Sequence, residues 1–283
     1  MTTCLQESAG ADAEIEPFTV PYRPLMEPTP AGRDLHLHTS PEFAMKRLLC
    51  RGSGPIFQIG PVFRQGELGP LHAPEFCMAE WYRPGWTCRE LTAEVEEIVA
   101  EAVEGKVVAR GREIILAPPF PRVSLAEAFA AAGVDAEKLR GADERGAREK
   151  FYRAYVDRLD PWLAGQGALF LTDFPPALAM LAQLAPDGRT AERFELLIAG
   201  IELANGATEL TDPAEYRRRF ETDRSARAAT GKSVTPLPEA FLHDLDQLGL
   251  PPCAGVALGL DRLAMLAAGV NRVDQVQAFP FMR

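Results

Sequence analysis

The stretch IFQIGPVFRQGELGPLHAPEFCMAEWY, residues 56–82, carries the pattern that decides the fold. Residues 56–64 are typical of a strand, and residues 76–82 are typical of a strand that returns beside it. The loop between them is rich in glycine and proline, which favour a change of chain direction. Because side chains alternate along a strand, Glu80 and Tyr82 should share one face. The first predicted element is therefore an antiparallel hairpin.

Strands and helices alternate on both sides of this hairpin. Further strands are expected at residues 35–39, 168–174, 194–210 and 253–260, the third bent around Gly200 and Asn205-Gly206. Helices are expected to begin at Ser40-Pro41, at the capping boxes of residues 87–90 and 124–127, at Asp212-Pro213 and at Asp261-Arg262. Residues 134–165 are charged and helical in pattern. Strands paired by loops, with helices inserted, favour an α+β fold in which an antiparallel sheet is flanked by helices.

Size and charge exclude several classes of protein. The chain has 283 residues, of which 47% are hydrophobic, so it can bury a substantial core. Its net charge of −10 argues against broad binding of nucleic acid, which requires a basic surface. Five scattered cysteines indicate reduced thiols and a cytoplasmic protein. No apolar run approaches a membrane span, no signal peptide is expected, and the chain has no P-loop motif.

Charged residues gather on the hairpin itself rather than on a solvated helix face. Residues 63–67 read Phe-Arg-Gln-Gly-Glu, and residues 72–76 read His-Ala-Pro-Glu-Phe. A binding site would explain them, and so would a polar hairpin with no function.

Three glutamates, Glu195, Glu202 and Glu209, are spaced by seven residues within otherwise apolar strands. Buried carboxylates are costly unless they are paired or bind a metal. A spacing of seven places neighbours on opposite faces of a regular strand, but a bulge at Gly200 would bring Glu195 and Glu202 to one side. Oxygen ligands of this kind suit Mg²⁺. Solvent-facing acids are the alternative interpretation.

A glycine-rich strand ending near residue 260 leads directly into a helix that begins at Asp261-Arg262. Glycine in a strand allows a ligand to approach the backbone closely. Arg262 lies at the helix N-terminus, where the helix dipole favours an anion. The arginine therefore suggests an anionic partner such as a phosphate.

Taken in this order, the three features resemble the motifs of the class II aminoacyl-tRNA synthetases. Residues 63–76 resemble motif 2, and residues 259–263 resemble motif 3. Three further stretches of this chain resemble the lysyl branch of the class, at residues 39–48, 192–212 and 279–283. We therefore expect residues 35–283 to form a class II catalytic domain. Residues 1–34 would be an irregular N-terminal remnant whose first six residues resemble the tail of motif 1, and because motif 1 builds the dimer interface in this class, a homodimer remains open.

The resemblance implies a site for ATP and Mg²⁺. Arg64 resembles the arginine that grips the α-phosphate and the amino-acid carboxylate, and Arg262 resembles the arginine on the γ-phosphate; both are the expected catalytic residues. His72 and Phe76 resemble the pair that positions and stacks on adenine. Glu195 and Glu202 resemble the magnesium ligands. The full expected ATP-binding set is Arg64, Glu67, His72, Phe76, Glu195, Glu202 and Arg262.

The resemblance also implies a groove for a lysine-type amino acid. Its cationic side-chain amine needs carboxylates, which Glu80 and Glu209 can supply. Glu42 resembles the residue near the α-amino group. The full expected substrate-binding set is Ser40, Glu42, Glu80, Tyr82, Asn205, Glu209, Ala257 and Gly259. The reaction would form an aminoacyl-adenylate and pyrophosphate.

The acceptor is suggested by a resemblance to a truncated relative of the lysyl enzymes, the family of elongation factor P lysine ligases. Residues 77–84, CMAEWYRP, resemble a segment of that family. Ala257 stands where the tRNA synthetases have glycine, a change associated with a preference for (R)-β-lysine over lysine. Residues 1–34 leave no room for an anticodon-binding barrel before the core, which argues against tRNA as the acceptor. The expected acceptor is therefore a lysine ε-amine of elongation factor P.

Two alternatives stay open on the sequence alone. One is a free-standing lysine-activating enzyme that charges tRNA or another acceptor, and the other is a non-catalytic paralog that binds a ligand. The chain also departs from the family pattern in three places. Gly66 replaces a glutamate near the adenine, Ala73 replaces an asparagine, and Ala207 replaces an aromatic residue near the substrate.

Overall fold

The computed structural model describes residues 1–8, 14–24, 32–135 and 145–281. Its centre is a seven-stranded sheet with the order β4-β5-β12-β11-β10-β9-β8. The strands are Ile56–Phe63 (β4), Glu75–Pro84 (β5), Arg122–Ser124 (β8), Ala168–Thr172 (β9), Arg193–Ile198 (β10), Ile201–Thr208 (β11) and Cys253–Gly259 (β12). All neighbours are antiparallel except β8 and β9, which are parallel. The predicted α+β fold is confirmed, with one parallel pair at the edge of the sheet.

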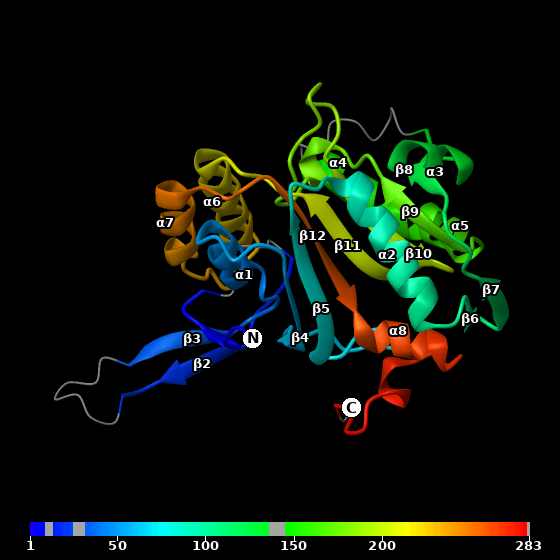
Figure 1. Cartoon of the computed structure of the whole chain (residues 1–283), viewed down its shortest axis with the longest axis horizontal. Helices are drawn as coiled ribbons and strands as arrows, with labels where there is room; N and C mark the ends of the chain where they lie inside the picture. The colour runs from blue at the N-terminus through cyan, green and yellow to red at the C-terminus, as the bar shows by residue number, and fades with distance from the viewer. Residues whose placement is uncertain (9–13, 25–31, 136–144, 282–283) are drawn as a thin grey trace.

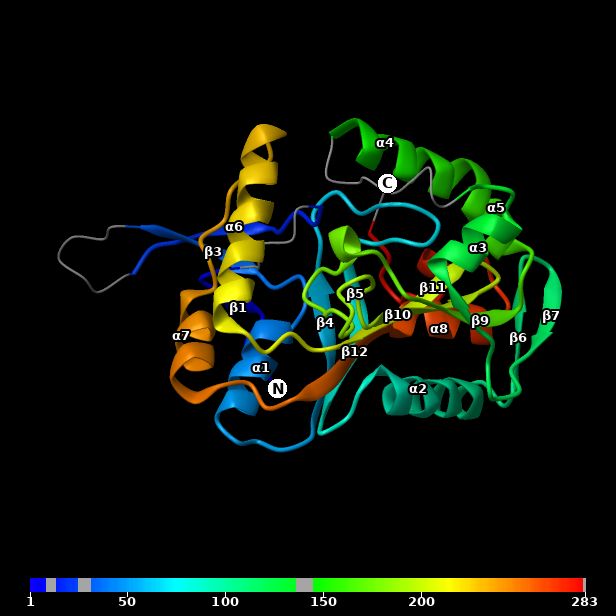
Figure 2. The same ribbon diagram turned by 90° about the horizontal axis from the view of Figure 1, so that it is seen from above.

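Helices cover both faces of this sheet, as the two views in Figure 1 and Figure 2 show. The α-helices are Glu42–Cys50 (α1), Cys88–Ala102 (α2), Leu125–Ala131 (α3), Arg145–Ala154 (α4), Asp160–Ala164 (α5), Pro213–Ala229 (α6), Glu239–Leu248 (α7) and Leu260–Ala267 (α8). A π-helix, Tyr155–Leu159 (η2), joins α4 to α5, and short 3₁₀-helices span Pro176–Leu178 (η3) and Val273–Gln275 (η4). Residues 136–144 of the predicted helical region lie outside the described residues.

Three hydrophobic clusters divide the two faces of the sheet between them. On one face, α2 and α8 bury apolar side chains against Val256 and Leu258 of β12. On the opposite face, α1, α6 and α7 pack around Tyr82 and Cys253. The same face carries α3, η2 and α5 near β9 and β10, where Leu171 is fully buried. The strand residues between these last two clusters carry the polar side chains described below.

The N-terminal segment is not wholly irregular, which corrects the sequence-based expectation for residues 1–34. Leu5–Gln6 (β1) and Thr19–Tyr22 (β2) pair on either side of Arg33–Leu37 (β3). The predicted boundary at residue 34 thus falls within a strand. These strands are short and pair over long sequence separations, so a local pattern could not reveal them. A hairpin of Lys106–Ala109 (β6) and Arg112–Ile115 (β7) was also not predicted.

The start of α1 differs from the prediction by one residue. The helix begins at Glu42, with Pro41 rather than Ser40 at the N-cap. Ser40 Oγ still accepts a hydrogen bond from the backbone N–H of Glu42 at 3.0 Å, and the Ser40 hydroxyl donates a hydrogen bond to Glu80. Both predicted capping boxes, at Thr87 and Ser124, are confirmed.

The β10–β11 hairpin also corrects the prediction of where the strands bend. Ala199 and Gly200 form a two-residue turn with φ of 51° and 72°, the backbone that tight hairpins favour. The bulge therefore lies not at Gly200 but on β11 around Leu203, where the register shifts opposite Leu196. β11 runs without a break through Asn205-Gly206, because Gly206 allows the ring of Phe194 to lie against its backbone.

Candidate active site

One row of side chains crosses the central strands on the face opposite α2. Glu80 on β5 lies opposite Ala257 on β12. Ala257 in turn lies opposite Asn205 on β11, and Asn205 lies opposite Glu195 on β10. Because paired residues project to the same face, these four predicted site residues form a continuous line across four strands.

At one end of this row, Glu80 is held by two hydroxyl groups. Tyr82 Oη donates to Glu80 Oε1 and Ser40 Oγ donates to Glu80 Oε2, both at 2.7 Å. The Glu80–Tyr82 bond confirms that these residues share a face. Burial, together with the nearby charge of Glu42, raises the pKa of Glu80 to about 7. The carboxylate is therefore preorganised, and a cation would restore its ionised form.

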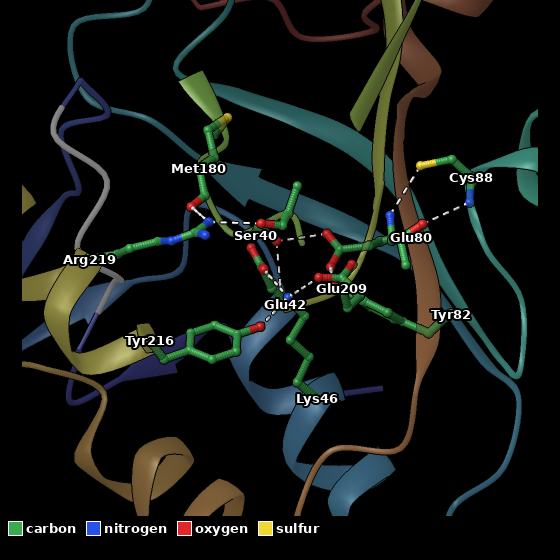
Figure 3. A network of polar contacts seen from close by, with 12 residues as sticks. Ser40, Glu42, Lys46, Glu80, Tyr82, Cys88, Met180, Glu209, Tyr216 and Arg219 are labelled. Carbon is green, nitrogen blue, oxygen red and sulfur yellow. Dashed lines mark hydrogen bonds and ion pairs between the residues drawn. The ribbon is translucent and has the colours of Figure 1, made fainter. Parts of the chain in front are cut away.

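Beside Glu80 lies a buried lysine that the sequence-based site did not include (Figure 3). Lys46 Nζ is 2.5 Å from both Glu42 Oε1 and Glu209 Oε2, and it donates to Tyr216 Oη at 3.1 Å. Burial opposes the charged ammonium, but the two carboxylates outweigh burial and raise the pKa of Lys46 well above its usual value. The structure thus brings together Ser40, Glu42, Glu80, Tyr82 and Glu209, as the resemblance implied.

The floor beneath this group is made of glycine for a steric reason. A Cβ at Gly255 would lie 2.3 Å from Tyr82 Cε1 and 2.5 Å from Glu209 Oε1. Real Cβ atoms do not approach other atoms so closely, so any larger residue would displace these two side chains. Gly259, at the end of the same strand, has no such neighbour within 3.8 Å and leaves its face open.

At the other end of the row, two carboxylates converge on one amide. Asn205 Nδ2 lies 3.4 Å from both Glu195 Oε1 and Glu202 Oε1. The bulge on β11 therefore brings the two glutamates to one side, as predicted, although from another position. Arg193 bonds to Glu195 and donates to Asn205 Oδ1 at 3.3 Å, so it fixes the orientation of both.

This carboxylate pair fits a magnesium ion. Burial raises the pKa of Glu195 to about 7 although Arg193 opposes the shift, so a second cation would stabilise its ionised form. Glu202 is 44% exposed and can meet a ligand that arrives from solvent. The described part of the chain holds no cluster of three metal-binding side chains. Two protein carboxylates completed by phosphate oxygens are the coordination that Mg²⁺ commonly takes.

The motif 2 arginine lies over an aromatic ring. Arg64 follows β4, and its guanidinium carbon is 5.1 Å from the centre of the Phe76 ring. Its Nε donates to the carbonyl oxygen of Thr39 at 3.3 Å, and its Nη1 lies 3.7 Å from Glu67. β4 ends at Phe63, so Glu67 lies in a turn that faces Arg64. Gly66 in that turn has a φ of 83°, which favours the glycine found there over a glutamate.

The motif 3 arginine is attached to backbone carbonyls. Arg262 donates to the carbonyl oxygens of Leu71 and Glu202, at 3.1 and 2.7 Å. Its Nη2 also lies 3.0 Å from His72 Nε2. Since an arginine only donates, this His72 nitrogen must be unprotonated. Burial and the charge of Arg262 lower the pKa of His72 accordingly.

Two residues at this site were missed from the sequence, the buried Lys46 and the largely buried Arg193. Each had a usable signal. Glu42 and Lys46 are four residues apart on one helix face. Arg193 and Glu195 are two apart on one strand face.

All five cysteines are free, as expected for reduced thiols. None of the helices in the described residues is both long and apolar enough to span a membrane.

Comparison with known proteins assigns the family. The model for tRNA synthetases class II (D, K and N) matches residues 1–283. The "Elongation factor P--(R)-beta-lysine ligase" of Proteus mirabilis (strain HI4320) is 38% identical over 294 residues, which cover 100% of this chain and 88% of that protein. The protein of the same name from Photorhabdus laumondii is 40% identical over 260 residues, covering 88% and 78%. The chain therefore belongs to the class II tRNA synthetases, and within them to the family of the elongation factor P (R)-β-lysine ligases.

Proposed function

We propose that this ligase uses ATP to activate a lysine-type amino acid, (R)-β-lysine or lysine, as the adenylate, and transfers it to a lysine ε-amine of elongation factor P. The observation that carries the proposal is the separation of an anionic end, formed by Glu42, Glu80 and Glu209, from a cationic end, formed by Arg64 and Arg262. Glu80, with Glu42 and Glu209 beside it, suits the ammonium groups of a diamino acid. Arg64 and Arg262 suit the phosphates of ATP.

The two ends meet at Thr39 and Ser40. Arg64 Nε donates to the Thr39 carbonyl oxygen, and the next residue, Ser40, donates to Glu80. An amino acid whose ammonium lies at Glu80 would therefore direct its carboxylate toward Arg64. This arrangement supports Arg64 as the residue that holds both the carboxylate and the α-phosphate.

The first step joins the amino acid to AMP. A carboxylate oxygen attacks the α-phosphorus, a new P–O bond forms, the bond to the β-phosphate breaks, and pyrophosphate leaves. Positioning and positive charge carry the rate, because the protein makes no covalent bond. Glu195 and Glu202 would hold Mg²⁺, which when bound neutralises phosphate oxygens. His72 and Phe76 would position the adenine.

The second step moves the aminoacyl group to the acceptor. An uncharged ε-amine attacks the adenylate carbonyl, an amide bond forms, AMP leaves, and the amine loses a proton. The names of the relatives support elongation factor P as the acceptor. Ala257 lies between Glu80 and Asn205 in the row, and its methyl group changes the floor where the amino group of a β-amino acid would lie.

Pyrophosphate exchange followed by transfer tests both steps. The purified protein is incubated with ATP, Mg²⁺, labelled pyrophosphate and either (R)-β-lysine or lysine, and label entering ATP is measured. Elongation factor P or tRNA is then added, and transfer of labelled amino acid is measured. We expect exchange with at least one of the two amino acids and labelling of elongation factor P.

The outcomes separate the proposal from its alternatives. If neither amino acid supports exchange, only the interpretation as a non-catalytic paralog remains. Exchange with labelling of tRNA alone would replace elongation factor P by tRNA as the acceptor. An elongation factor P variant in which the acceptor lysine is arginine provides the matched control for the second step.

A further inference from the structure

Lys46 is fully buried, yet it lies among groups that the proposed function assigns to the substrate. Its ammonium contacts one oxygen of Glu42 and one oxygen of Glu209. Within the part of the chain that the structure describes, the second oxygens, Glu42 Oε2 and Glu209 Oε1, accept no hydrogen bond. Each carboxylate is therefore held by Lys46 on one side and remains free to bind on the other.

The groups facing the ammonium come from several elements. Glu42 lies on the same helix, Glu209 follows β11, and Tyr216 lies on α6. The ring centres of Tyr82 and Tyr216 lie 5.8 and 5.6 Å from Lys46 Nζ. The thiols of Cys50 and Cys253 are also near enough for the charge on Lys46 to act on them.

The ionised side chains around Lys46 determine the net charge of the pocket. The carboxylates of Glu42, Glu80 and Glu209 and the ammonium of Lys46 together leave two negative charges when all are ionised. Arg219, also drawn in Figure 3, donates to Glu215 and to the carbonyl oxygens of Met180 and Ala182, and among the described residues it bonds to none of these four groups. A diamino acid brings two ammonium groups, whereas an ordinary amino acid brings one.

We propose that Lys46 is a specificity-determining residue: a fixed internal cation that neutralises one of the three carboxylates and so matches the pocket to the two ammonium groups of a diamino acid. The inference rests on the proposed function for the position of the substrate. Without Lys46, the buried carboxylates of Glu80 and Glu209 and the partly buried carboxylate of Glu42 would face one another. One of them would then take up a proton, because a buried carboxylate without a cation is strongly disfavoured.

Proton counting tests this role directly. Calorimetric titration of the protein with lysine, repeated in buffers of different ionisation enthalpy, gives both the affinity and the number of protons released on binding. In the Lys46→Met variant, a proton replaces the ammonium and is shared among the three carboxylates, so it competes with the substrate ammonium groups for the same oxygens. We expect its lysine affinity to fall at least about tenfold, which is about 1.4 kcal/mol. We also expect the number of protons released on binding to differ from that of the natural protein by up to one.

Tyr216→Phe is the matched control, because it removes a contact of Lys46 without changing any charge. Its proton count should equal that of the natural protein, and its affinity should stay within about threefold. A Lys46→Met protein that is folded by circular dichroism and binds lysine with unchanged affinity and proton count would overturn the inference.

If Lys46→Met does not fold, Glu42→Gln carries the test. Glu42 is 28% exposed, and its replacement leaves Lys46 in place with only one net negative charge. We expect the preference for lysine over 6-aminohexanoate, which lacks the α-amino group, to fall at least about tenfold. An unchanged preference overturns the inference.

Failure of the inference and failure of the proposed function are distinguishable. The binding measurements need no catalysis, whereas the proposed function depends on pyrophosphate exchange. A protein that exchanges normally but shows none of the expected binding changes retains the proposed function and refutes the role of Lys46.

Discussion

At the anionic end of the proposed active site, Lys46 and Glu80 are 0% and 3% exposed, and their polar atoms are bonded to other side chains. At the cationic end, the side chains of Arg64 and Arg262 are 23% and 22% exposed and are bonded mainly to backbone carbonyls. The anionic end therefore has its geometry before substrate arrives. The arginines can exchange carbonyl contacts for phosphate contacts at small cost, because charged donors bind phosphate more strongly.

Substitutions at the anionic end should therefore affect folding, whereas substitutions at the cationic end should affect the chemical step. Removing one partner of a buried ion pair costs about 3–5 kcal/mol, so changes at the anionic end risk the fold itself. Changes at the partly exposed cationic end should leave the fold intact and reduce the rate.

The largest expected effect is at the carboxylate pair. Glu202→Ala removes one of two proposed magnesium ligands, and we expect pyrophosphate exchange to fall about a thousandfold, to the limit of detection. Exchange rates measured over a range of Mg²⁺ concentrations check this, and thermal unfolding checks that the half-exposed residue is dispensable for folding. Glu202→Asp, which keeps the charge, is the control. A Glu202→Ala variant with unaffected exchange would refute the magnesium assignment.

The next effect is expected at Arg64. Arg64→Ala removes positive charge from the proposed α-phosphate site, and we expect kcat for exchange to fall by a factor of about 100 to 1,000. Its thermal midpoint should change little, because the side chain bonds to one carbonyl and lies over one ring. Steady-state exchange kinetics and calorimetry provide the measurement. A loss seen only in KM for the amino acid would place Arg64 in binding rather than in the chemical step.

The cationic end was largely predictable from the sequence, because each of its residues lies in a contiguous motif. Residues 64–76 and 259–262 are each continuous in sequence, so the residues of each motif could be recognised together without knowledge of the fold. For the carboxylate pair, the sequence predicted that Glu195 and Glu202 lie on one side, but it predicted the wrong position for the bulge. The spacing of the two glutamates required a bulge, but Ala199-Gly200 forms the hairpin turn and the bulge lies at Leu203.

The anionic end was harder to predict, because its contacts join distant parts of the chain. Lys46 is four residues from Glu42 but 163 from Glu209 and 170 from Tyr216. Periodicity along α1 predicts only that Lys46 lies near Glu42. That the lysine is buried depends on α6 and the end of β11 closing over it, which only tertiary packing decides.

A smaller, steric effect is expected on the floor of the anionic end. Gly255→Ala places a methyl group 2.3 Å from Tyr82 Cε1, so Tyr82 and the carboxylates must shift. We expect KM for the amino acid to rise about 10- to 100-fold, while KM for ATP stays within about threefold. Gly60→Ala on β4 is the control, because its Cβ would meet only Met1 Sδ at 3.8 Å. Equal effects of the two substitutions on KM would contradict a tight floor at Gly255.

The smallest effect is a pH dependence of amino-acid binding at the anionic end. Burial and the charge of Glu42 raise the pKa of Glu80 to about 7, so the free protein holds a proton there below that pH. A substrate ammonium needs the ionised carboxylate and must displace this proton. KM for the amino acid should therefore rise as the pH falls through 7, by up to about tenfold between pH 8 and pH 6. KM for ATP, measured in the same assays, should keep its own pH dependence in the Glu80→Gln variant, because it depends on Glu195, whose pKa burial also raises to about 7. The KM of Glu80→Gln for the amino acid should be raised and should change less across this range, and the change that remains belongs to Glu209, whose pKa burial also raises to about 7. A step that persists at full size in this variant would assign the pH dependence of amino-acid binding to Glu209 rather than to Glu80.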